Sequence, residues 1–339
     1  MPRAWWPLLG LVACSREQPD SPANEPPAAS SSPQPATELE RGSTPDFAPA
    51  LVGSLFTATQ MDRVSFGWRA PCFVPVRYFV QKVSGDTFVV GALLNVTEDG
   101  PDFLLSFSDL MFEHIDGVDL PRGSPAVAAE AVKSENVLPT IRVSKQGHYL
   151  EYTNADDAMA VALDHARGDD TEKLDALQRQ PELRRYTKEF GRKFWHPWVE
   201  RWLELRLDHR GTEQRRERLN LFGRSFEIEV AITDHGNIDG HPELRLLEAR
   251  STVDGAEGEA LGRELMATAE TLADGEVPED VELSAVTWER ITRIAIDPRL
   301  GFPHHVRESV NIRIGDTHAL KIQAWEFDWA ASRGCADPS

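Results

Sequence analysis

The sequence predicts an α+β fold: an antiparallel β-sheet, with strong curvature as one option, in which a helical section separates two strand-rich halves. Two stretches, 62–152 and 224–330, contain apolar runs that are divided by short turn-like segments. The stretch between them, 154–206, shows apolar residues at helical spacing. The chain has no strand–helix–strand alternation and no Gly-rich strand-to-helix turn, which would indicate a parallel sheet. We therefore expect residues 48–335 to form a single α+β domain.

The first strand-rich half contains apolar runs rich in Val, Phe and Leu. The segments between them, Ser-Gly-Asp and Glu-Asp-Gly-Pro-Asp, have turn compositions. Connections this short join antiparallel neighbours. The expected strands occupy 73–83, 86–96 and 102–115, followed by a hairpin over 139–153 that turns at Gly147.

The middle section is expected to be helical. Asn154 suits a helix N-cap, and Asp156 and Asp157 follow it in the first turn, where the helix dipole favours negative charge. Pro181 and Pro197 each suit the first turn of a further helix.

The second strand-rich half contains one strand of clean alternation. There Ile228, Val230 and Ile232 face one way between charged residues, as in a strand with one buried face. A helix is expected over 258–273, and a long hairpin over 286–314.

The last strand, 319–329, changes the phase of its apolar residues. Leu320 and Ile322 share one face, whereas Trp325 and Phe327 fall on the other. A bulge or a sharp bend near Ala324 would account for the change.

Residues 1–13 have the layout of a secretory signal peptide. Arg3 supplies positive charge, residues 4–13 carry no charge and are mostly apolar, and the small Ala13 precedes Cys14. A helix of that length rises only about 15 Å, whereas the hydrocarbon core of a bilayer is about 30 Å thick. The segment is therefore expected to be a leader and not a membrane span.

The stretch Leu11, Val12, Ala13 and Cys14 resembles the lipobox of bacterial lipoproteins. The resemblance implies cleavage after Ala13, acylation of Cys14, and attachment to the membrane through acyl chains, which anchor stably when two or more are present. Ser15 at the next position implies the outer membrane, with the domain facing the periplasm or, alternatively, the cell surface. The alternatives are an ordinary cleaved signal with a chance cysteine, or a chance apolar start.

Residues 14–47 are expected to form a tether of low order behind the lipidated cysteine. Residues 15–46 contain seven Pro and six Ser, and Leu39 is their only large aliphatic residue. Such a composition buries too little apolar surface to offset the entropy of ordering. The chain as a whole has a net charge of −19. That charge argues against nucleic acid as a partner, because nucleic-acid binding requires basic surfaces.

The three cysteines leave an even pair once Cys14 is assigned to lipid. The bacterial periplasm is oxidising, so Cys72 and Cys335 are candidates for a disulfide. The alternatives are two free thiols, or a Cys72 that is simply buried.

Three tryptophans fall on one face of an expected helix. Trp195, Trp198 and Trp202 stand at positions i, i+3 and i+7. They could form a ligand-facing aromatic wall, or they could fill the core between helix and sheet. His196 lies off this stripe and is expected to be exposed or to act as a helix cap.

No catalytic or metal-binding motif is found. The segment 234–241 gathers Asp, His and Asn, but it lacks the spacing of a calcium loop or of a helical zinc pair and reads as a turn. The motifs of serine hydrolases, β-lactamases, zinc proteases and P-loop enzymes are missing. We therefore expect no metal and no cofactor, and the catalytic residues, if there are any, are unknown.

The leading functional hypothesis is non-catalytic binding of a hydrophobic ligand or of an envelope protein partner by a membrane-anchored lipoprotein. The final hairpin, with Asp-Pro-Arg-Leu-Gly-Phe-Pro at 297–303, loosely resembles the curved half-barrels of lipid and lipoprotein carriers. The alternatives are a hydrolase with dispersed catalytic residues and a purely structural or interaction module.

Overall fold

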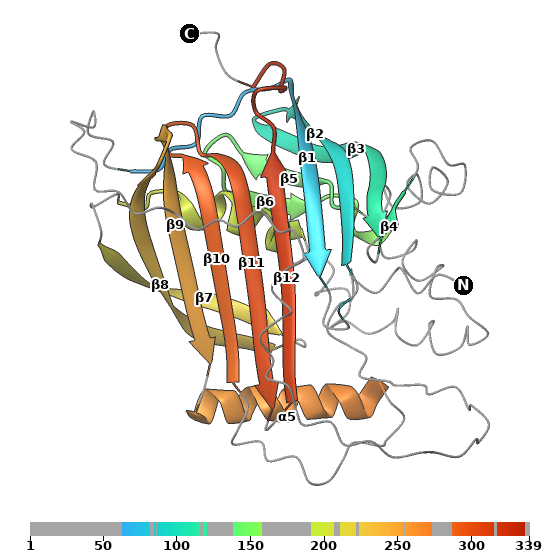
Figure 1. Ribbon diagram of the computed structural model, residues 1–339, viewed down its shortest axis with the longest axis vertical. Coiled ribbons are helices and arrows are strands. Elements are labelled where there is room, and N and C mark those ends of the chain that lie inside the picture. The colour runs from blue at the N-terminus through green and yellow to red at the C-terminus, as the bar shows by residue number, and fades with distance from the viewer. Residues whose placement is uncertain are drawn as a thin grey trace, which may run out of the picture.

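The computed structural model describes residues 63–81, 85, 87–115, 118–120, 138–157, 191–206, 211–221, 224–253, 255–272, 287–314 and 317–335. Within these ranges the chain forms one antiparallel sheet of twelve strands that does not close on itself (Figure 1). The signal peptide, Cys14, the tether and most of the expected helical section lie outside the described residues. None of the helices inside them combines the length and the apolar composition that crossing a bilayer requires.

The strands are β1 (Cys72–Gln81), β2 (Thr87–Asp99), β3 (Asp102–Ile115), β4 (Val118–Asp119), β5 (Ile141–Ser144), β6 (Tyr149–Tyr152), β7 (Thr212–Leu221), β8 (Arg224–Ile238), β9 (His241–Val253), β10 (Thr287–Asp297), β11 (Phe302–Ile314) and β12 (Thr317–Phe327). The helical elements include the 3₁₀ turn η1 (Glu200–Trp202) and α5 (Gly255–Leu272). A helix over 191–198 leads into η1, and the two together are called the 191–202 segment below.

The strand order is β6-β5-β3-β2-β1-β12-β11-β10-β9-β8-β7, with β4 paired to β3. Most neighbours in the sheet are also neighbours in the chain. The neighbouring strands that are farthest apart in the chain are β1 and β12. Their pairing places Val76 opposite Phe327 and Gln81 opposite Ile322. The first and last strands therefore meet in the middle of the sheet, and the edges are β6 and β7.

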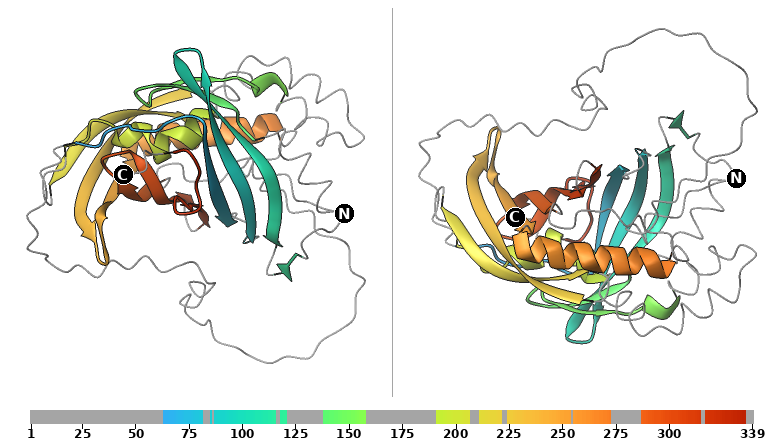
Figure 2. Two further views of the ribbon diagram at one scale, coloured as in Figure 1. Left: turned by 90° about the horizontal axis from the view of Figure 1, so that it is seen from above. Right: turned by 90° about the horizontal axis from the view of Figure 1, so that it is seen from below.

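The sheet is strongly curved. Views along the strands show β5 and β6 at one end, and β7 and β8 at the other, turning toward the same side (Figure 2). The 191–202 segment lies on that inner, concave side, and α5 crosses below the lower ends of the central strands (Figures 1 and 2). We call the face toward the 191–202 segment the inner face.

The predicted α+β class is wrong, because the described chain is nearly all-β. Helix is limited there to 155–157, the 191–202 segment and α5. The strand β7 was not expected, because its sequence Thr-Glu-Gln-Arg-Arg-Glu-Arg is almost wholly charged or polar. As an edge strand it has a sheet neighbour on one side only, and charged side chains on an edge discourage pairing with other chains.

The final strand also differs from its prediction. The register of β12 with β1 and β11 runs without a shift, so no bulge occurs near Ala324. Leu320 and Ile322 simply occupy the outer face of the strand, and Trp325 and Phe327 the inner face. The phase of the apolar residues changes because both faces of this central strand are partly covered.

The inner face is filled at its upper end by aromatic side chains. Trp68 contacts Trp195, Phe302 and Trp329 with ring centroids 5.3, 5.9 and 5.4 Å apart, all near perpendicular. Edge-to-face contacts of this kind stabilise beyond the area that they bury. The upper end of the sheet is thus a solid core.

An extended stretch, 63–68, covers this upper end. The amides of Ser65 and Gly67 donate to the carbonyls of Pro298 and Leu300 at 2.8 and 2.9 Å. Gly301 ends the β10–β11 turn with a φ of 66°, and a Cβ there would lie 2.6 Å from the carbonyl oxygen of Ser65. A side chain at 301 would therefore both strain the turn and displace the covering stretch.

Cys72 and Cys335 form a disulfide, with Cα atoms 4.5 Å apart. Both residues are buried, and the amide of Phe73 also donates to the carbonyl of Arg333 at 3.0 Å. The bond therefore ties the C-terminal tail to the start of β1.

Reduction of this disulfide should lower the free energy of unfolding. The bond joins positions 263 residues apart, and the loss of loop-closure restraint in the unfolded chain corresponds to roughly 5 kcal/mol on an entropic account. Denaturant titration of the Cys14→Ser chain with and without reductant measures the difference. The triple variant that also carries Cys72→Ser and Cys335→Ser is the control, and it should not respond to reductant. Equal midpoints for the oxidised and reduced Cys14→Ser chain would contradict a stabilising bond.

Candidate functional site

The three tryptophans of the aromatic stripe lie in the core. Trp195, Trp198 and Trp202 have exposed fractions of 0%, 1% and 0%. The indole nitrogens of Trp195 and Trp202 donate to the carbonyls of Gly147 and Pro197 at 2.7 and 2.8 Å. The interpretation as a ligand-facing wall is therefore corrected: the 191–202 segment lies inside a curved sheet, and its apolar stripe packs against the strands around it.

The polar segment 234–241 spans the irregular end of β8, a turn at Asp239 and Gly240, and the first residue of β9, so the turn suggested by its composition is limited to two residues. Arg245 holds it, since its guanidinium pairs with the Asp234 carboxylate and donates to Asn237 Oδ1 at 3.0 Å. Among the described residues no group of His, Cys, Asp and Glu side chains has the arrangement of a metal site.

A polar row crosses the inner face halfway down the central strands. Thr292 of β10, Glu308 of β11 and Gln323 of β12 stand side by side in register. The Thr292 hydroxyl and the Gln323 amide donate to separate oxygens of the Glu308 carboxylate, at 3.2 and 2.9 Å. Tyr78 of β1 extends the row by donating to Gln323 Oε1 at 3.3 Å. Burial raises the pKa of Tyr78 well above its ordinary value of 10, so its hydroxyl keeps its proton.

Arg201 connects this row to the edge strand β7. Its side chain is 1% exposed, and its Nε and Nη2 donate to the two oxygens of Glu217 at 2.8 and 2.7 Å. Its Nη1 donates to the Thr292 hydroxyl at 2.9 Å. A bidentate pair of this kind fixes both distance and orientation.

His196 and Glu200 complete the cluster on the 191–202 segment. The ring nitrogens of His196 lie 3.1 Å from Glu200 Oε2 and 3.2 Å from Glu217 Oε2. Arg192 donates to the same oxygen of Glu200 at 3.0 Å. His196 is therefore neither an exposed residue nor a cap, and the expectation from the sequence is wrong: the residue joins two carboxylates.

We call these residues the inner polar cluster: Arg192, His196, Glu200, Arg201, Glu217, Arg290, Thr292, Glu308 and Gln323. Two of its carboxylates, Glu200 and Glu217, are held in the charged form. Burial opposes ionisation of Glu200, but His196 and Arg192 outweigh it and lower the pKa from 4.5 to about 2. Burial is likewise outweighed at Glu217 by His196 and Arg201, which hold its pKa far below the usual range.

Two donors in and beside this cluster lack an acceptor. The Nε of Arg290 and the Nε1 of Trp198 are buried and have no hydrogen-bond partner in the part of the chain that the structure describes. Trp198 packs on Trp325, which follows Gln323 by two residues on β12 and so lies on the same face. Arg290 precedes Thr292 by two residues on β10 and also lies on that face. The two unsatisfied donors thus lie on opposite sides of the polar row. A buried donor without an acceptor costs free energy, and such groups call for an explanation.

This geometry suits binding better than acid–base catalysis. Both ring nitrogens of His196 are engaged by carboxylates, so the ring has no free nitrogen to exchange a proton with a substrate. The carboxylates of Glu200 and Glu217 have strongly lowered pKa values and are poor proton donors near neutral pH. What the cluster does offer is N–H groups without acceptors.

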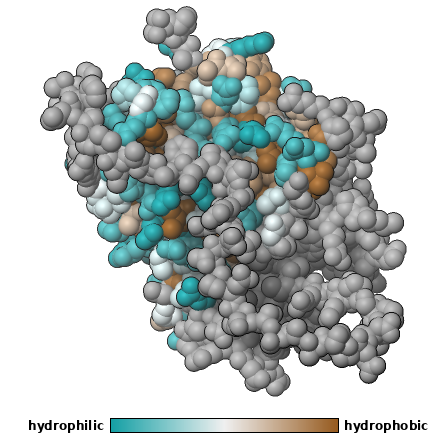
Figure 3. All heavy atoms as spheres, in the orientation of Figure 1, coloured by the Kyte–Doolittle hydropathy of each residue, from teal (hydrophilic) through white to brown (hydrophobic). Residues whose placement is uncertain are grey.

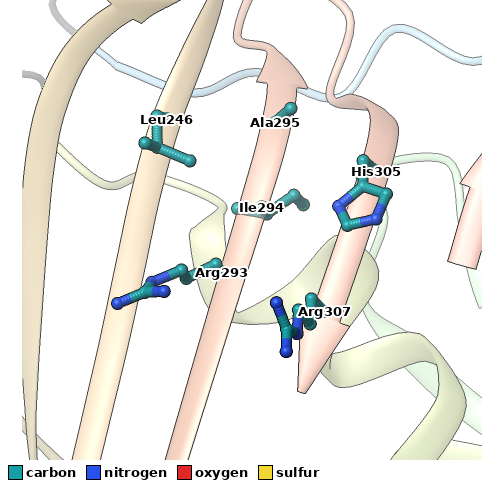
Figure 4. Close-up of a pocket in the computed structure, with 6 residues that line it drawn as sticks. All are labelled: Leu246, Arg293, Ile294, Ala295, His305 and Arg307. Carbon is teal, nitrogen blue, oxygen red and sulfur yellow. The ribbon is translucent and has the colours of Figure 1, made fainter. Parts of the chain in front are cut away.

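A second, smaller feature lies on the outer face. Leu246, Ala295, His305 and Arg307 border a shallow hollow about the size of one water molecule, with Arg293 at its edge (Figure 4). Burial, with a smaller contribution from Arg307, lowers the pKa of His305 to about 4, so the ring is neutral. Where Figure 3 shows the described residues of this face, hydrophilic side chains are interspersed with smaller hydrophobic areas toward the upper end. The hollow is too small to hold more than a solvent molecule or a small ion.

The inner polar cluster was missed in the sequence for an identifiable reason. Arg201 and Thr292 are 91 residues apart, and Tyr78 and Gln323 are 245 apart. One local signal was present: Arg290, Thr292, Glu308 and Gln323 are polar at positions where the alternation of their strands points inward. Polar residues on a buried face are the informative exceptions.

No family model matches the chain, and no curated protein matches it either.

Loss of the Glu217 carboxylate should destabilise the fold. Glu217→Gln removes a charge that Arg201, almost fully buried, has no other carboxylate to replace, and breaking one partner of a buried pair costs about 3–5 kcal/mol. Thermal and denaturant unfolding measure the loss. Glu229→Gln on the neighbouring strand is the matched control, because Glu229 is exposed and its loss should change stability by less than about 0.5 kcal/mol. Equal stability of the two variants would show that the pair contributes nothing.

Acid should weaken the same cluster in a defined window. Because the folded pKa of Glu200 is lowered to about 2 from 4.5, its contribution to stability is complete above about pH 4.5 and is lost as the pH falls toward 2. The free energy of unfolding should therefore fall more steeply over this window in the native chain than in Glu200→Gln. Parallel curves for the two proteins would rule out an ionised, cluster-bound Glu200.

Proposed function

We propose that the chain is a lipid-anchored, non-catalytic binding protein of the bacterial outer membrane that holds a hydrophobic ligand against the inner face of its open sheet. The lipobox at Cys14 supports the anchor, and the Pro- and Ser-rich stretch behind it supports a tether between anchor and domain. Support for a ligand comes from the side chains of the inner face.

The observation that carries the proposal is a buried donor without an acceptor among the described residues, the Nε of Arg290. It lies on the concave side of a sheet whose described edges, β6 and β7, are not paired with each other. A ligand with an acceptor atom would satisfy it, and the neighbouring apolar side chains Val310 and Ile312 are only partly buried. Binding sites of small molecules commonly combine such apolar walls with a few polar groups.

An envelope protein remains the alternative partner. An edge strand that pairs with a second chain is one common mode of protein recognition. Of the two described edges, however, β7 is polar and exposed at Gln214 and Arg216, and β6 is only four residues long, and both features are typical of edges that avoid pairing. The inner face is therefore the better-supported site.

Native mass spectrometry of the Cys14→Ser chain, exported to the periplasm and purified without detergent, tests the proposal. We expect a population heavier than the bare chain by a discrete mass of lipid size, which organic extraction removes. The native chain, extracted from membranes, is the control for the anchor and should carry the acyl groups covalently. A bare chain whose Trp fluorescence ignores added lipids would overturn ligand binding, and a co-purified protein without a small molecule would favour the protein partner.

A further inference from the structure

We propose that the ligand is an anionic amphiphile whose negatively charged head accepts hydrogen bonds from Arg290 while its hydrocarbon chain lies on the apolar inner face. This inference rests on the proposed function and adds the chemical class of the ligand. The head is a group such as a carboxylate, and the chain is what distinguishes the ligand from a simple anion.

Arg290 is the least neutralised cation of the inner polar cluster. Its side chain is 17% exposed, and its ion pair with Glu217 joins Nη2 to Oε2 at 3.4 Å. Glu217 already accepts both bonds from Arg201 and faces His196 at 3.2 Å. Since a carboxylate has about four acceptor positions, little is left for Arg290. Its Nε accordingly has no acceptor at all.

The buried polar atoms without a partner on the described inner face are all hydrogen-bond donors, which need an acceptor. Arg290 Nε and Trp198 Nε1 are both donors. The third buried polar atom without a partner among the described residues, Asn311 Oδ1, belongs to the outer face, because Asn311 alternates with the inward Val310 and Ile312. A ligand that supplies only acceptors, such as a carboxylate or phosphate, fits this pattern, whereas a cationic head does not.

The charges of the cluster point the same way. Burial and the nearby Arg201 lower the pKa of Arg290 to about 10, and the carboxylates of Glu308 and Glu217 offset that lowering only in part. An anionic group beside the guanidinium would stabilise its charged form.

The surroundings of Arg290 favour an apolar chain on the ligand. The guanidinium lies 5.5 Å from the ring centre of Trp288 on the same strand. Val310 stands opposite Arg290 on β11, with Lys321 of β12 beyond it, and Ile312 stands opposite Trp288. A small hydrophilic anion would satisfy the guanidinium but leave these apolar side chains uncovered, whereas a hydrocarbon chain would cover them at about 25 cal/mol for each Å² removed from water.

Isothermal titration calorimetry on the full Cys14→Ser chain, stripped of bound lipid, tests the inference with three probes. Dodecanoate carries head and chain, 1-dodecanol carries the same chain with an uncharged head, and acetate carries the head alone. We expect dodecanoate to bind at least tenfold more tightly than dodecanol, and acetate to show no measurable binding. This comparison needs no variant.

Variants then locate the head. Arg290→Gln should weaken dodecanoate at least tenfold and leave dodecanol unchanged. Arg293→Gln is the matched control: Arg293 is on the same strand, faces outward and pairs with Glu248 at 2.7 Å, so its loss should not alter binding. Near-ultraviolet circular dichroism checks that each variant retains the native packing.

The outcomes separate the two proposals. Equal binding of dodecanoate and dodecanol overturns the anionic head but leaves a hydrophobic ligand in place. Acetate binding as tightly as dodecanoate overturns the amphiphile. Dodecanoate binding that is indifferent to Arg290→Gln in a folded variant overturns the assigned site, and binding of neither amphiphile counts against the proposed function itself.

Discussion

The constraint on which this structure depends is that a strongly curved sheet with separate edges cannot fill its own concave side. In the described chain the 191–202 segment does so, and its position is fixed by the bidentate pair between Arg201 and Glu217. Trp195 and Trp202 pack as they do because that segment is held against the strands, and the pair also ties the segment to β7, which is itself held by its pairing with β8. Sheet curvature, aromatic packing and the charged cluster are therefore parts of one arrangement.

A buried ion pair is not an efficient way to stabilise a protein, since desolvation offsets much of the attraction. Here the ion pair is better understood as fixing the position of the 191–202 segment. A helix packed on a sheet by apolar contacts alone can slide or rotate with modest loss, whereas Arg201 makes three directed bonds to two strands. The same rigidity holds Arg290 next to an already saturated carboxylate, which is why its guanidinium is left with an unused N–H. The ligand-binding property that we propose would thus be a by-product of how the segment is fixed.

Local features of the fold were predictable and long-range features were not. The alternation of Ile228, Val230 and Ile232, the turn at Gly147 and the long hairpin of β10 and β11 depend on neighbouring residues, and their patterns are visible in the sequence. The fold class was wrong because the described chain is nearly all-β, and β7 was not recognised as a strand because it carries the charges of an edge. The candidate site depends on side chains up to 245 residues apart, so only the inward polar residues of β10–β12 hinted at it.

The pairing of β1 with β12 has a consequence for biogenesis. Synthesis from the N-terminus delivers β1 early and β12 last, so the centre of the sheet can be completed only when synthesis is nearly finished. Until then the two halves of the sheet each present an unpaired inner strand, β1 on one side and β11 on the other, and long-range pairing of this kind is slow to form. During this stage the chain would expose both strands to neighbouring copies. Its strongly negative charge of −19 would then keep the incomplete halves of neighbouring copies apart until the last strand arrives.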